Sequence, residues 1–262
     1  MHLVNRLARR IGPGFVLVLA WALISLGNAV KYGTYTPLAI TLVSAGVVAL
    51  TAGMWFLGRC AGRPGWPALS LAALVALIST IFSPAERYAR GGAEHWSHGL
   101  LIAATLVLLA LAGWPGRPRA LGYAVLALAG AAGIAGIRAT PRPTIDDFHI
   151  LQGSAKALLH LHNIYAHAWP GSDGHLMPYL PGSAILLAPF YLLFSDVRYG
   201  LLAALLLAAL AVTRLGRSGD SRRLAVLGGL MVTFPWVLYL IEQSWPEALL
   251  LALVTASSRW SR

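Results

Sequence analysis

The chain has 262 residues, of which 58% are hydrophobic and 11% are charged, and its formal net charge is +11. Soluble domains carry about 25% charged residues, so this composition excludes an ordinary soluble protein and indicates a membrane protein with several spans. The arginines lie in small groups between apolar runs, without a basic stripe beside aromatic residues, which argues against nucleic acid as a partner. The single cysteine, Cys60, excludes an internal disulfide.

Apolar runs without charged residues fill most of the first half of the chain. They cover residues 11–30, 37–57, 67–82, 98–114 and 120–137. Each approaches the roughly 17 to 25 residues that a helix needs to cross a bilayer. The connectors alternate between arginine-only and acid-bearing segments. If the N-terminus is cytoplasmic, the arginine-only connectors lie inside, as the positive-inside rule requires, and the segment 138–198 lies outside.

The second half predicts one helix that does not cross and three more spans. The apolar run 181–194 would be about 21 Å long as a helix, which is short for a hydrocarbon core of about 30 Å, so it predicts a re-entrant or interfacial helix on the outer side. Spans are predicted over 199–213, 224–241 and 246–258. The fold class is therefore an all-α transmembrane bundle. Four spans lie in residues 1–119, and four more, with the outer loop 138–198 and its interfacial helices, lie in residues 120–262.

Small residues recur in the span 120–137. Gly130, Gly133 and Gly136 follow one another at intervals of three, which predicts close packing of this span against a neighbouring helix.

The outer loop contains a sequence typical of a helix start. Thr144-Ile-Asp-Asp147 predicts a capping box in which Thr144 is the N-cap and Asp147 the third helical residue. Ser244-Trp-Pro-Glu247 predicts a second capping box at the start of the last span, on the same side of the membrane. Capping and catalysis are compatible, because a carboxylate at a helix start can also serve as a base. Two acidic helix starts are therefore expected to converge on the outer side.

The helix after Asp147 is predicted to be amphipathic and to lie at the membrane interface, with a polar stripe toward water or a ligand. The stripe contains His149, Gln152, Lys156 and His160. Metal binding by the loop histidines is not favoured, since no pair has zincin spacing and His160 and His162 are expected on different faces. No cofactor and no histidine metal site are predicted, and a divalent metal ion is left open as an alternative.

The loop contains four short elements in a fixed order, and these resemble a known family. They are Asp147, Asn163-Ile-Tyr165, Tyr179-Leu-Pro181 and Ala188-Pro-Phe190. The order resembles the first extracytoplasmic loop of GT-C glycosyltransferases, most closely the bacterial polyprenyl-phosphate-mannose-dependent mannosyltransferases. Further along, Phe234-Pro-Trp236 and the run from Glu242 to Leu249 resemble the second outer loop of the same superfamily.

The resemblance implies an integral glycosyltransferase of the cell membrane, or the N-terminal part of one. It would transfer mannose or a similar sugar, with inversion, from a polyprenyl-phosphate donor to an extracytoplasmic lipid, glycan or protein acceptor. Asp147 would accept the proton of the attacking hydroxyl, and Asp146 would position the acceptor or raise the basicity of its neighbour. The residues that would bind the donor phosphate are Lys156, Arg138, Arg142 and Arg198. Those that would position donor or acceptor are His149, Asn163, Tyr165, Tyr179, Gln243 and Glu247.

A transporter or a non-enzymatic membrane protein is the alternative. Transporters place ionisable residues within their spans and show duplicated halves. The predicted spans carry no charge except Glu247 at the start of the last one, and the two halves differ, which favours the enzyme and leaves the alternative to experiment.

Overall fold

The computed structural model describes most of the chain, and every regular element in the described residues is a helix. The described residues are 16, 19–24, 26–27, 36–57, 65–82, 92–114, 116, 118–141, 143–166, 168–215, 221–234 and 236–260. The expected all-α class is thus confirmed for this part of the chain.

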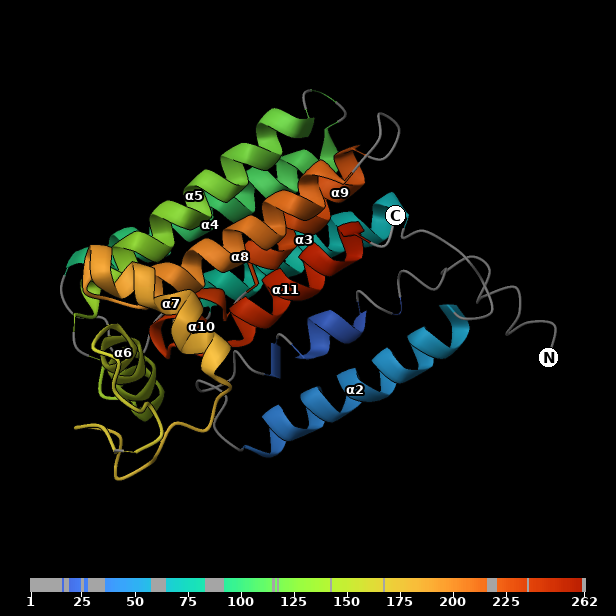
Figure 1. The fold of residues 1–262 in the computed structure, drawn as a ribbon. Coiled ribbons are helices and arrows are strands. Elements are labelled where there is room, and N and C mark those ends of the chain that lie inside the picture. Colours follow the sequence, from blue (N-terminus) through green and yellow to red (C-terminus); the bar gives the residue numbers. More distant parts are fainter. Residues whose placement is uncertain are drawn as a thin grey trace.

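Most of the helices run roughly side by side, as Figure 1 shows. They are α2 (Pro37–Leu57), α3 (Trp66–Phe82), α4 (Gly92–Gly113), α5 (Pro118–Ala139), α8 (Arg198–Arg214), α9 (Ser221–Val232) and α11 (Glu247–Trp260). The helices α6 (Asp146–Leu159), α7 (Pro181–Phe194) and α10 (Val237–Glu242) lie together at one end. This end carries most of the residues for which a function is predicted.

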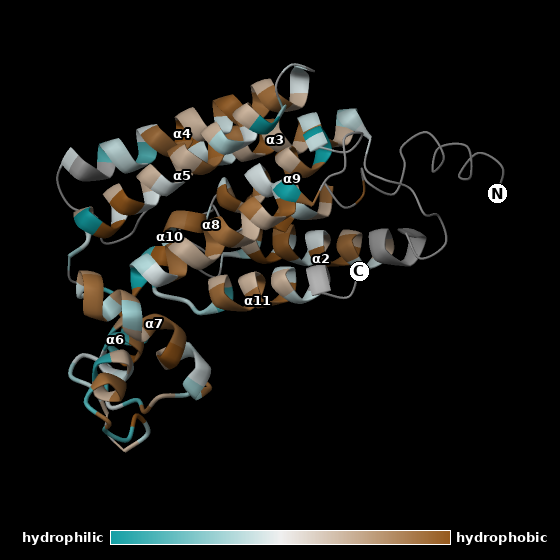
Figure 2. Ribbon diagram, turned by 45° about the horizontal axis from the view of Figure 1, so that its top comes forward, coloured by the Kyte–Doolittle hydropathy of each residue, from teal (hydrophilic) through white to brown (hydrophobic). Residues whose placement is uncertain are grey.

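Two of the described helices, His95–Gly113 within α4 and Pro118–Ala139, are long and apolar enough to cross a membrane. A third qualifies if α7 and α8 count as one bent span. The hydropathy colouring in Figure 2 shows the bundle helices to be largely hydrophobic, whereas hydrophilic residues gather in the loop next to α6. These helices indicate a membrane protein.

The helix predicted over 181–194 is confirmed as an element separate from the span that follows it, and its location on the outer side stays a prediction. α7 ends at Phe194, Ser195 takes the left-handed conformation with φ 58°, and α8 leaves at 116° to α7. The Gln152 side chain of α6 holds this elbow from both sides: its amide nitrogen donates to the Ser195 carbonyl at 2.6 Å, and its amide oxygen accepts from the Val197 N–H at 3.0 Å. α6 is therefore fastened to the elbow.

The prediction of one continuous helix over 224–241 is wrong. α9 ends at Val232, and α10 begins at Val237 and has only six residues. Proline lacks the N–H that a helix interior needs and disfavours the helical conformation of the preceding residue, so Pro235 accounts for an interruption here. The break sends the chain toward the end of the bundle where α6 lies (Figure 1).

Close helix packing at small residues is confirmed for α5. A Cβ at Gly133 would lie 2.6 Å from Leu202 of α8, and one at Gly130 would lie 3.2 Å from Leu206. The tightest approach to a rigid backbone is at Gly228 in α9, where a Cβ would lie 2.6 Å from the Ala209 carbonyl oxygen. Only glycine fits there, because the backbone of α8 cannot yield as a flexible side chain can.

Gly228→Ala is expected to lower the unfolding temperature in detergent, with a loss of about 1–3 kcal/mol, the usual scale of overpacking. Gly99→Ala in α4 is the matched control, since nothing lies within 4 Å of the added methyl group. The control should be neutral or stabilising, because alanine is the better helix former. If both variants have the wild-type unfolding temperature, α8 and α9 do not pack as described.

Candidate active site

Asp146 and Asp147 open α6, but the capping box expected there is wrong. The N-cap residue is Ile145, without a side-chain cap, and Thr144 is exposed. Instead, the Asp146 carboxylate accepts the N–H of Asp147 at 2.9 Å. Negative charge at a helix start is favourable in any case, because the free N–H groups there carry partial positive charge. The side chain of Asp147 is thus not used for capping.

A series of hydrogen bonds links the predicted loop residues to Asp147. The Asn163 amide oxygen accepts the N–H of Tyr165 at 2.9 Å, and the Tyr165 hydroxyl donates to the Tyr179 carbonyl at 3.1 Å. The Tyr179 hydroxyl then donates to the Asp147 carboxylate. The structure therefore brings together four residues that the sequence had singled out, across more than thirty positions of the chain.

Trp245, in the turn between α10 and α11, also donates a side-chain hydrogen bond to Asp147. The ring of Tyr239 holds this indole edge-on, with centroids 5.9 Å apart. Trp245 was not among the predicted site residues, so its contact with the acid was missed. One signal in the sequence was available. Trp245 stands next to Pro246, in a short turn before a second acidic helix start.

The second capping box, at Ser244, is also wrong. Ser244 has φ 62° and is fully buried, and within the described residues its hydroxyl has no hydrogen-bond partner. The neighbouring Gln243, predicted to position donor or acceptor, is 1% exposed, and its amide nitrogen is likewise buried without a described acceptor. Gln243 therefore lies inside the protein at the turn that carries Trp245.

The surroundings of Asp147 alter its acidity. Partial burial raises the pKa of the Asp147 carboxyl above its ordinary value, and the negative charges of Asp146 and Glu247 raise it further. The hydrogen bonds from Tyr179 and Trp245 act in the opposite direction and lower the pKa. A carboxylate whose pKa is raised binds a proton more strongly, which suits a general base.

Tyr179 remains a hydrogen-bond donor to that carboxylate. Burial raises the pKa of the Tyr179 hydroxyl, and the contact with Asp147 raises it again. The phenol therefore stays protonated at physiological pH, and its hydrogen fixes the orientation of the carboxylate.

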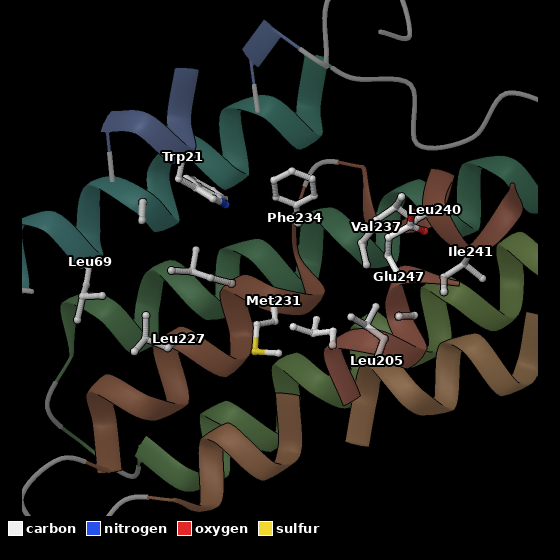
Figure 3. Close-up of a pocket in the computed structure, with 14 residues that line it drawn as sticks. Trp21, Leu69, Leu205, Leu227, Met231, Phe234, Val237, Leu240, Ile241 and Glu247 are labelled. Carbon is white, nitrogen blue, oxygen red and sulfur yellow. The ribbon is translucent and has the colours of Figure 1, made fainter. Parts of the chain in front are cut away.

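An apolar cavity of about 510 Å³ lies beside this acidic cluster, between α3, α8, α9, α10 and α11. Figure 3 shows Trp21, Leu69 and Phe234 on one side and Ile241 and Glu247 toward the other. The other labelled lining residues, such as Leu205 and Met231, are hydrophobic, so Glu247 contributes a charged carboxylate to an otherwise apolar wall. Glu247 thus connects the cavity with Asp147, whose pKa it raises.

Lys156 and His149 lie on another face of α6 from Asp147. Nine residues separate Lys156 from Asp147, which corresponds to about half a turn around the helix and about 13 Å along it. His149 is likewise about 200° away from Asp147, and its ring packs against Gly171. These positions do not support the roles predicted for Lys156 and His149 at the same reacting centre.

The three predicted arginines have different surroundings. Arg198 is 1% exposed, pairs with Asp196 at 2.6 Å and lies 4.9 Å above the Phe148 ring, so its charge already has partners within the fold. Arg138 is exposed in the last turn of α5. Arg142 lies outside the described residues. Among the described cations, Arg138 therefore keeps the role predicted for the donor phosphate.

The end of α6 corrects the expected placement of two histidines. The N–H of His162 donates to the Ala157 carbonyl and that of Leu161 to the Leu158 carbonyl, with Leu161 at φ 56°. This is a Schellman motif, which reverses the chain direction at a helix end. His160 and His162 consequently lie on the same side, with ring centroids 6.1 Å apart. The described residues contain no group of three side chains that could hold a metal ion.

Comparison with known proteins adds no relative: no family model, no curated protein and no solved structure matches the chain. The site must therefore be interpreted from its own chemistry.

Proposed function

We propose that this protein is a membrane glycosyltransferase that uses a polyprenyl-phosphate sugar donor and Asp147 as its general base. The observation that carries the proposal is the environment of one carboxylate. Asp147 is held by donors from two separate segments, Tyr179 and Trp245, its pKa is raised, and it is not used for capping. A structural acid would ordinarily be neutralised by a cation, whereas here further acids surround it.

In the proposed reaction the Asp147 carboxylate takes the proton of an acceptor hydroxyl while its oxygen attacks the anomeric carbon. The bond from that carbon to the phosphate oxygen breaks, and polyprenyl phosphate leaves with the bonding electron pair. The configuration inverts because attack and departure occur on opposite faces of the sugar. The charge of Asp146 strengthens the base by raising its pKa. Arg138 and Arg142 are the cations proposed for the leaving phosphate.

The apolar cavity supports a lipid-linked donor. A volume of about 510 Å³ with hydrophobic walls suits several isoprene units and would not suit a nucleotide, which needs polar partners for its base and ribose. Glu247 lies where this cavity approaches Asp147, which would place the lipid chain and the reacting sugar next to each other.

Sugar transfer is the direct test. Membranes containing the protein should move a radiolabelled sugar from polyprenyl phosphate to an endogenous acceptor and should not use the corresponding nucleotide sugar. A bulky substitution inside the cavity, Ala72→Phe, should weaken use of the full-length lipid donor more than that of a short-chain analogue. Transfer that occurs equally well from the nucleotide sugar would contradict the proposal.

The proposed extracytoplasmic location of the site gives a separate prediction. In a Cys60→Ser background, Asp173→Cys in the loop after α6 and Arg119→Cys in the first turn of α5 both place a thiol at an exposed position. An impermeant maleimide added to intact cells should label the first and spare the second. Equal labelling of both before cell disruption would reject this topology.

A further inference from the structure

A groove of about 450 Å³ lies on the polar face of α6, away from Asp147. Its lining residues are His149, Gln152, Gly153, Lys156, Ala157, His160, His162, Trp169 and Pro170. None of these carries a carboxylate. The groove therefore offers nitrogen-containing side chains and one positive charge. It lies on the side of α6 opposite to the reacting centre proposed above.

The groove is formed by tight local packing. The indole of Trp169 lies against Gly153, where a Cβ would come within 2.5–2.8 Å of the ring, so only glycine allows this wall to approach the helix. The Schellman turn returns His162 beside His160 at the other end. Lys156, His160 and His162 are exposed in between.

The side chains of the groove indicate the charge of the ligand. The Nδ1 atom of His160 lies 2.9 Å from the Lys156 carbonyl and must donate to it, so this nitrogen is not available as a metal ligand. Lys156 and His162 are exposed, and no carboxylate lines the groove. An exposed ammonium group beside an imidazole, with no acid to neutralise it, repels cations and favours an anion.

We infer that this groove is a second anion site, separate from the reacting centre, which binds a phosphate group through the Lys156 ammonium group and the imidazole of His162. A tetrahedral phosphate presents several acceptor oxygens to donors that approach from different sides, and a lysine ammonium binds it as a point charge. The phosphate belongs either to the headgroup of an anionic lipid or to a small soluble molecule. The inference does not depend on the proposed transferase activity.

The test measures thermal unfolding of the full chain in nanodiscs. In one arm, discs of phosphatidylcholine receive pyrophosphate, with sodium chloride at matched ionic strength as the reference. In the other arm, discs contain phosphatidylglycerol in place of part of the phosphatidylcholine. Stabilisation by pyrophosphate identifies a soluble phosphate ligand, and stabilisation confined to phosphatidylglycerol discs identifies a lipid headgroup.

Variants assign the effect to the groove. Lys156→Gln should weaken the apparent affinity by about tenfold, the scale expected when a charged hydrogen bond is lost. His162→Gln should weaken it independently. Arg119→Gln, which removes an exposed positive charge outside both the groove and the proposed donor site, is the matched control and should leave the affinity unchanged. Both groove side chains are exposed, so the variants should unfold at the wild-type temperature without ligand.

Either of two results overturns the inference. One is the absence of stabilisation in both arms. The other is an equal loss in Lys156→Gln and Arg119→Gln, which would assign the effect to the overall positive charge. Because unfolding is measured without any sugar transfer, failure here leaves the proposed activity standing. Conversely, an inactive transferase would leave the groove inference intact.

Discussion

Asp147→Asn is expected to reduce sugar transfer by at least about 100-fold, the lower end of what general base catalysis usually contributes. The amide keeps an oxygen that can accept the Tyr179 hydroxyl, so the local geometry should persist, but it cannot take the proton of an attacking hydroxyl. Transfer of labelled sugar from polyprenyl phosphate, at saturating donor, measures the effect.

The same variant should not lose stability. Since the folded-state pKa of Asp147 is raised, the folded protein holds this proton more tightly than the unfolded chain does, and that stabilising contribution is lost as the pH rises through the folded-state pKa. At neutral pH the ionised side chain is therefore unfavourable, and asparagine removes it. If the unfolding temperature equals or exceeds that of the wild type while transfer is abolished, the loss of activity is due to lost catalysis and not to misfolding. Wild-type turnover in this variant would reject Asp147 as the base.

Tyr179→Phe and Asp146→Asn are expected to move the acid limb of the pH profile of kcat/KM in opposite directions. The limb reports the pKa of the base in the free enzyme. The Tyr179 hydrogen bond lowers the pKa of Asp147, so its removal should move the limb to higher pH, whereas removal of the Asp146 charge should move it to lower pH. Tyr179→Phe should also reduce the plateau rate by about tenfold, as expected for loss of a hydrogen bond to a charged group.

Tyr165→Phe provides the matched control for this pair. It removes the same kind of hydroxyl, but one that donates to the Tyr179 backbone rather than to the carboxylate. The acid limb should stay in place in this variant. Limbs that move in the same direction in Tyr179→Phe and Asp146→Asn would show that a group other than Asp147 controls the rate.

The sequence was sufficient to predict the parts of the site that depend on local patterns. The polar stripe of α6 and the separate helix α7 follow from periodicity and length, and the structure confirms both. The resemblance to a family also selected Asn163, Tyr165 and Tyr179, which lie in one series of hydrogen bonds that ends at Asp147.

The wrong or missing predictions have a common physical cause. Tertiary contacts, and not the local sequence, determine the conformation of these turns. Nothing local distinguishes Thr144 from an N-cap, yet α6 begins with Ile145 in that position. The placement of His162 depends on Leu161 adopting a left-handed conformation that its residue type disfavours. The contact between Trp245 and Asp147 joins segments about a hundred residues apart, which periodicity within one helix cannot reveal.

The two hydrogen bonds of the Gln152 amide have a mechanical consequence. They fasten α6 to the α7–α8 elbow, where Arg198 also pairs with Asp196. Asp147, at the first turn of α6, belongs to this fastened part, and so does Tyr179, which lies two residues before α7. We therefore expect any opening of the proposed site to come from the segment of Trp245. The gate and the base would then belong to different parts of the chain.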